Sequence, residues 1–81
     1  MLSMYTTNDL TPKQRRILEY LRERKDDRTY FKSRLIGEDL DMSAKEVGAN
    51  MPAIADGEVV DDIEVERWGY SSATTWEVTA R

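Results

Sequence analysis

Apolar residues recur through the first two thirds of the chain at the three- and four-residue spacing of amphipathic helices. The first stripe, with Tyr20 at its edge, predicts a helix over residues 12–25. Two further stripes predict a second helix from residue 33 and a third that starts after residue 43. The apolar positions of the three stripes are Ile17, Leu18 and Leu21, then Leu35, Ile36 and Leu40, then Val47, Met51 and Ile54.

Polar residues at the predicted helix starts support these boundaries. Thr11 and Gln14 have the identity and spacing of a capping box, in which each side chain satisfies the other residue's backbone N–H. Ser33 is expected to cap the second helix. Ser43 is expected to cap the third, with Glu46 completing a second capping box.

Two positions interrupt the helical pattern. Residues 41–42 predict a tight turn between the second and third helices. Pro52 falls inside the third helix, where its missing N–H and its ring disturb the preceding turn. We therefore expect this helix to kink at Pro52, or to break at residues 50–51 and restart, which shortens its uninterrupted part to about two turns.

The remaining apolar residues alternate with polar ones, as in strands with one buried face. Residues 29–31 predict one short strand, and two longer segments predict a C-terminal hairpin. The order helix, strand, helix, helix, strand, strand indicates an α+β fold in which a helix-turn-helix unit precedes a β-hairpin wing. The inward positions of the hairpin are Val59, Val60, Ile63 and Val65 on one segment, and Thr74, Trp76 and Val78 on the other.

One small core is all that a chain of 81 residues can build. Residues 1–9 carry no periodic pattern and are expected to be a flexible arm, and residues 10–81 are expected to be a single domain. The inward stripes predict a set of largely buried side chains. These are Ile17, Leu21, Leu35, Ile36, Leu40, Val47, Met51, Ile54, Val59 and Trp76.

Composition narrows the chemistry that is available. The chain has no Cys and no His, which removes disulfides, thiolate metal sites and the commonest general base. No Gly-rich phosphate loop is present, and the carboxylates are scattered over capping and surface positions. We therefore expect no enzymatic activity, no metal and no cofactor. No apolar run approaches the ~18 residues of a membrane span, so we expect a cytoplasmic protein.

Charge is unevenly distributed along the chain. The formal net charge is −4, but residues 1–45 hold ten Lys and Arg against eight Asp and Glu. Residues 46–81 hold two Lys and Arg against eight Asp and Glu. A basic contact surface must therefore lie in the first half or beside Arg67. The acidic, Lys-poor composition favours an origin in a halophilic archaeon, where salt of about 1 M screens charges beyond roughly 3 Å. The alternative is that one short sequence is acidic by chance.

Residues 10–22 resemble the opening helix of the DNA-binding domain of LexA-type repressors. The similarity extends over about residues 10–65 and includes Ser43, Met51, Ile54 and Val60. The chain also resembles short, stand-alone haloarchaeal winged-helix proteins of unassigned function. Residues 67–72 and 75–76 match these proteins better than they match the LexA type. These resemblances imply a winged helix-turn-helix domain that binds double-stranded DNA, without the LexA protease domain.

The resemblance also implies a set of contact residues. The third helix of such a domain lies in the major groove, with its first residues at the base edges. The positions carried over are Ser43, Ala44, Lys45, Gly48 and Ala49. Ser43 and the N–H groups after it are suited to a phosphate, Ala44 to a thymine methyl and Lys45 to guanine. A plainer interpretation leaves Ser43 as a helix cap and Lys45 as a solvated charge.

Cations outside the third helix are candidates for phosphate contact. Lys32 and Arg34 stand at the entry to the second helix, and Arg67 lies beside the predicted hairpin tip. The basic residues of the first helix are better explained as a solvated surface paired with nearby acids. Trp68 and Tyr70 are expected to pack on the sheet with Trp76, the alternative being an exposed contact device.

Two functions follow from this pattern. The first is a small transcriptional regulator that binds specific double-stranded DNA sequences. The second is a winged-helix module that binds protein, which the acidic second half and Pro52 favour. Because a short recognition helix covers few base pairs, we also expect a homodimer, with the N-terminal arm and the first helix as its contacts.

Overall fold

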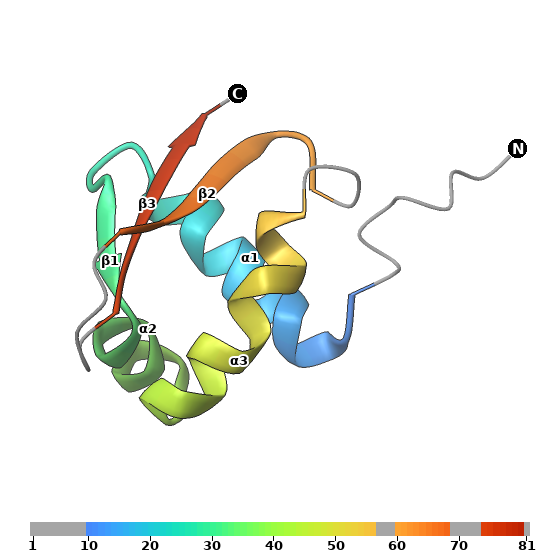
Figure 1. Cartoon of the computed structure of the whole chain (residues 1–81), viewed down its shortest axis with the longest axis vertical. Helices are drawn as coiled ribbons and strands as arrows, with labels where there is room; N and C mark the ends of the chain where they lie inside the picture. The colour runs from blue at the N-terminus through green and yellow to red at the C-terminus, as the bar shows by residue number, and fades with distance from the viewer. Residues whose placement is uncertain (1–9, 57–59, 69–73, 81) are drawn as a thin grey trace, which may run out of the picture.

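Three helices and a three-stranded antiparallel sheet make up the fold, so the α+β class and the order of elements are confirmed. The computed structural model describes residues 10–56, 60–68 and 74–80. Figure 1 shows the helices gathered on one side of the sheet, in a layout compatible with a winged helix. The elements are α1 (Pro12–Arg24), β1 (Tyr30–Lys32), α2 (Ser33–Leu40), α3 (Ala44–Ala55), β2 (Ile63–Trp68) and β3 (Thr75–Ala80).

Side-chain caps fix the starts of α1 and α3. Thr11 Oγ1 accepts from the Gln14 N–H at 3.1 Å, and Gln14 Oε1 accepts from the Thr11 N–H at 3.0 Å. The predicted capping box of α1 is therefore confirmed. Ser43 Oγ accepts from the Glu46 N–H at 3.0 Å, which confirms this cap also. The second capping box is wrong in its other half, because the Glu46 carboxylate turns to Lys13 on α1 instead.

The start of α2 differs from the prediction. Ser33 is the first residue of the helix, and the capping position belongs to Lys32, whose side chain makes no cap hydrogen bond. Ser33 Oγ instead accepts from Trp76 Nε1 at 2.8 Å, and the Ser33 N–H donates to the Thr74 carbonyl at 3.0 Å. Because β1 runs into α2 without a loop, the carbonyl of Thr74, just before β3, accepts from the first N–H of the helix in place of a side-chain cap.

A tight turn joins α2 to α3, as the sequence predicts. Asp41 adopts the left-handed conformation with φ of 60°, and the Met42 N–H donates to the Gly37 carbonyl at 2.8 Å. The turn passes so close to α2 that a Cβ on Gly37 would lie 2.3 Å from the Met42 carbonyl oxygen. Only glycine leaves room for this approach, which brings α3 against α2.

Of the two outcomes expected at Pro52, the break is wrong, because the helix continues through Pro52 to Ala55, and a kink stays a prediction. Pro52 is exposed, whereas Val47, Met51 and Ile54 form a fully buried stripe on the opposite side. Tertiary packing of an apolar stripe contributes more to helix stability than local propensity does. The buried stripe therefore holds the helical path although Pro52 donates no backbone hydrogen bond.

The strands are ordered β1-β3-β2, and β2 and β3 form the predicted hairpin. Phe31 lies opposite Trp76 across β1 and β3, and Trp76 lies opposite Arg67 across β3 and β2. The short strand covers residues 30–32 rather than 29–31. β2 begins at Ile63. Val60 is buried in the core, but it does not belong to a strand.

The core confirms seven of the predicted buried side chains: Ile17, Leu21, Ile36, Val47, Met51, Ile54 and Trp76. Leu35 and Leu40 are only half-buried, because the short α2 turns Ser33, Ile36 and Gly37 inward and leaves these leucines at its edges. Val59 lies outside the described residues. The core also contains Leu10, Leu18, Tyr20, Phe31, Val60, Ile63, Val65 and Val78.

Candidate nucleic-acid interface

The solvent-facing side of α3 carries small side chains and one cation. Ala44, Lys45 and Ala49 are exposed, Gly48 is half-exposed, and Pro52 continues the same face. A Cβ added at Gly48 would meet no atom within 4 Å, so no other part of the described chain covers this side. All of the predicted groove residues of α3 therefore share one accessible face, from which a ligand can approach the backbone closely.

The first turn of α3 offers polar groups next to this face. Ser43 is exposed, and its oxygen is engaged by the Glu46 N–H while its hydroxyl proton remains available to donate. The first N–H groups of a helix have no partner within the helix. Ser43 is thus a cap, as the plainer interpretation has it, and its position still suits an anionic ligand.

The one carboxylate on α3 is paired within the chain. Glu46 binds Lys13 Nζ on α1, and this contact holds the pKa of Glu46 below its ordinary value. Gln14 Nε2 donates to Asn50 Oδ1 at 3.0 Å, and Asn50 Nδ2 donates to the Glu46 carbonyl at 2.8 Å. The negative charge of Glu46 is therefore compensated and directed toward α1, which lowers the repulsion that a phosphate would meet.

Two of the three predicted phosphate-binding cations, Lys32 and Arg34, stand at the start of α2, and the third, Arg67, lies on β2. Lys32 and Arg34 flank Ser33, whose oxygen binds Trp76. The guanidinium carbon of Arg67 lies 6.0 Å from the centre of the Trp76 ring. Arg34 has a side chain 77% exposed, with its Nε 4.0 Å from Glu38. The structure does not bring all three onto one surface, because Lys32 lies opposite Thr75 on the outer face of the sheet, whereas Arg67 lies opposite Trp76 on the inner face.

Trp68 does not pack on the sheet with Trp76, and this prediction is wrong. The register places Trp68 opposite Thr75, so that the indole lies on the outer face while Trp76 points into the core. Trp68 is 58% exposed, and its ring centre is 5.4 Å from that of the exposed Tyr30. Tyr70 lies outside the described residues.

Comparison with known families gives one match. The model of a family described as a domain of unknown function, DUF7123, matches residues 1–80. The chain belongs to the DUF7123 family. No curated protein and no solved structure matches it. The LexA-type resemblance therefore stays a prediction.

Basic residues on α1 of the DUF7123 domain are mostly engaged within the chain. Arg22 binds both carboxylate oxygens of Asp62, at 2.7 and 2.9 Å, which raises the pKa of Arg22 and lowers that of Asp62. Arg22 also lies 3.3 Å from Glu19, and Lys25 lies 3.6 Å from Asp26, as predicted for a solvated helix surface. The sequence did not indicate the partner Asp62, which lies 40 positions away.

The described ranges contain neither a carboxylate metal site nor a membrane-spanning helix. Residues 10–56, 60–68 and 74–80 contain no group of three or more Asp or Glu side chains that is placed to hold a metal ion. Across the same ranges, no helix has the length and apolar character needed to cross a membrane. The accessible face of α3 is the candidate site of this DUF7123 domain.

Proposed function

We propose that this DUF7123 domain binds double-stranded DNA in a sequence-dependent manner and acts in the cytoplasm as a small transcriptional regulator without catalytic activity. The observation that carries the proposal is the accessible face of α3, which is built from small side chains and one cation within a helix-turn-helix unit. The major groove of B-form DNA, about 12 Å wide, admits one helix of this kind.

Small side chains on α3 favour close approach to the base edges. Ala44 and Ala49 are suited to apolar contact with thymine methyl groups, and Lys45 is suited to the O6 and N7 acceptors of guanine. The N–H groups of the first turn, together with the Ser43 hydroxyl, are suited to a phosphate beside the groove. Lys45 is then the one residue of α3 that makes a strong polar contact with a base.

Lys32, Arg34 and Arg67 contact phosphates in this arrangement, so they contribute affinity without sequence preference. We expect Lys32→Ala, Arg34→Ala and Arg67→Ala each to weaken binding to cognate and scrambled duplexes equally. Each substitution should also reduce the slope of log K against log salt by about one unit. Titrations of each variant on both duplexes over a salt series measure this. Arg28→Ala, which removes an exposed cation at the opposite end of β1, is the control and should leave the slope unchanged.

Lys45→Ala is expected to behave differently from these variants. Loss of one contact with a base edge should cost about 1–3 kcal/mol on the cognate duplex and relax the preference at a single base pair. Binding to the scrambled duplex should change little. Selection of bound sequences from a random pool, with wild type and variant in parallel, identifies the position that loses its preference. A uniform loss across all sequences would assign Lys45 to a phosphate instead.

A second function, binding of a protein partner, is favoured by the exposed Tyr30 and Trp68 rings on the outer face of the sheet. Exposed aromatic side chains are enriched in protein interfaces. The two functions are separated by a titration of wild-type protein with duplex DNA at low salt, where attraction to phosphate is strongest. If neither duplex binds there, DNA binding is refuted and the aromatic pair becomes the candidate site.

A further inference from the structure

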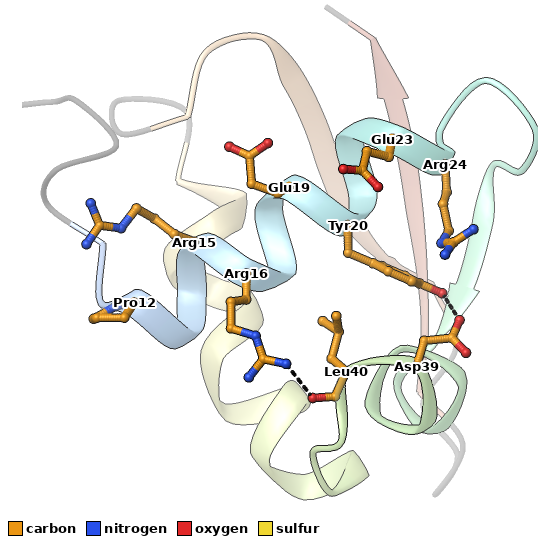
Figure 2. Close-up of a pocket in the computed structure, with 9 residues that line it drawn as sticks. All are labelled: Pro12, Arg15, Arg16, Glu19, Tyr20, Glu23, Arg24, Asp39 and Leu40. Carbon is orange, nitrogen blue, oxygen red and sulfur yellow. Dashed lines mark hydrogen bonds between the residues drawn. The ribbon is translucent and has the colours of Figure 1, made fainter.

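A groove of about 520 Å³ runs between α1 and the C-terminal end of α2. Its apolar lining is Pro12 from the start of α1, Tyr20 from its middle and Leu40 from the end of α2. Figure 2 shows Arg16 and Tyr20 reaching from α1 toward α2, where Arg16 donates to the Leu40 carbonyl at 2.8 Å. The groove is open to solvent and therefore suits an elongated occupant better than an enclosed small molecule.

The walls of the groove are fixed before any partner arrives. The Tyr20 hydroxyl donates to Asp39 Oδ2 at 2.5 Å, and burial together with this carboxylate raises the pKa of Tyr20 to about 12. The phenol consequently stays protonated and keeps its hydrogen bond over the whole physiological range. The Arg24 guanidinium lies 4.7 Å from the centre of the Tyr20 ring. A partner thus meets an ordered surface, which reduces the entropy lost on binding.

The charges that α1 presents along the groove are unevenly placed. Arg15 and Arg16 line its N-terminal half, and Glu19 and Glu23 line its C-terminal half. Arg24 and Asp39 also line the groove, but both are engaged by Tyr20, Arg24 over its ring and Asp39 through its hydroxyl. Within the described part of the chain, neither Arg15 nor Glu23 takes part in an ion pair. Glu19 and Glu23 are also four residues apart on one helix face, a like-charge spacing that disfavours the isolated helix. This pattern is complementary to a copy of itself that runs in the opposite direction.

We propose that the groove is occupied by α1 of a second copy of this chain, antiparallel to the first and related to it by a two-fold axis. Arg15 and Arg16 of each copy then lie opposite Glu19 and Glu23 of the other, so every favourable contact occurs twice. A parallel arrangement would bring like charges together. Pro12 and Leu40 supply apolar surface that the second copy covers. The inference goes beyond DNA binding and does not depend on it.

The test exchanges the two charges that have no partner within the chain. Sedimentation equilibrium without DNA, at about 0.1 M salt, compares wild type with Arg15→Glu, Glu23→Arg and the double variant. Wild type should dimerise, and each single variant should weaken dimerisation by about 10-fold to 100-fold, because each reversal creates two like-charge contacts. The double variant should recover most of the wild-type affinity, because the charges are exchanged and remain complementary.

Controls separate this interface from general effects of charge and folding. Glu64→Arg reverses an exposed carboxylate on the outer face of the sheet and should leave the dimer unchanged. Arg15→Gln and Glu23→Gln remove single charges with little risk to folding and should weaken the dimer less than the reversals do. A wild type that is monomeric at every concentration, single variants that dimerise normally, or a folded double variant without recovery would each overturn the proposal.

Discussion

Leu21→Ala is expected to lower the free energy of unfolding by about 2–5 kcal/mol, a large part of the stability of a domain this small. Leu21 is 0% exposed and lies in the inner stripe of α1, where truncation leaves a cavity that the surrounding elements cannot fill. Urea unfolding followed by tryptophan fluorescence measures the loss, because Trp76 is buried in the folded chain and becomes exposed on unfolding.

Leu35→Ala is the matched control, since the same residue type is removed from a position that the sequence pattern also assigned to the core. Leu35 is half-buried at the edge of α2 and lines a small pocket with Tyr20 and Arg24. Its truncation exposes little new cavity, so we expect a loss of about 1 kcal/mol. Equal losses for the two variants would contradict the burial described for α2.

Gly37→Ala is expected to be much more damaging than the same change at Gly48. The new Cβ would lie 2.3 Å from the Met42 carbonyl oxygen, so the turn between α2 and α3 must move. Overpacking against a backbone atom costs about 1–3 kcal/mol, and occasionally more. Because the same turn sets the orientation of α3, DNA affinity should fall more steeply than the loss of folded protein explains. Thermal unfolding and a binding titration on the same sample measure the two effects.

Gly48→Ala makes the same chemical change where the structure leaves room. No atom lies within 4 Å of the added Cβ, and alanine is about 0.8–1 kcal/mol more favourable than glycine inside a helix. This variant should therefore unfold at a higher temperature than wild type. If Gly48→Ala destabilises as much as Gly37→Ala does, the loss is not caused by the contact with Met42.

Much of the fold follows from local pattern. The stripes containing Ile17, Val47 and Met51 identify buried helix faces because helical periodicity places them on one side. The capping box of Thr11 and Gln14 marks the start of α1 to the residue, because its hydrogen bonds form within one turn. The positions of α3 assigned to the candidate interface are accessible for the same reason, as they lie opposite its buried stripe.

What the sequence misses depends on contacts between distant segments. Ser33 has the identity of a cap, but its partner is Trp76, 43 positions away. Glu46 has the spacing of a capping box, but Lys13 on another helix competes successfully for its carboxylate. Trp68 has the large apolar side chain that is typical of a core residue, and only the strand register shows that it faces outward. Periodicity carries no information on which of two satisfactory partners the fold selects.

Two hydrogen bonds join Ser33 to the C-terminal strand and the residue just before it. Trp76 Nε1 donates to the Ser33 hydroxyl oxygen, and the Thr74 carbonyl accepts from the Ser33 N–H. Separation of α2 from β3 therefore has to break both bonds together. Local opening of the sheet is thus coupled to loss of the first turn of α2, so the two parts should exchange their amide protons as one unit.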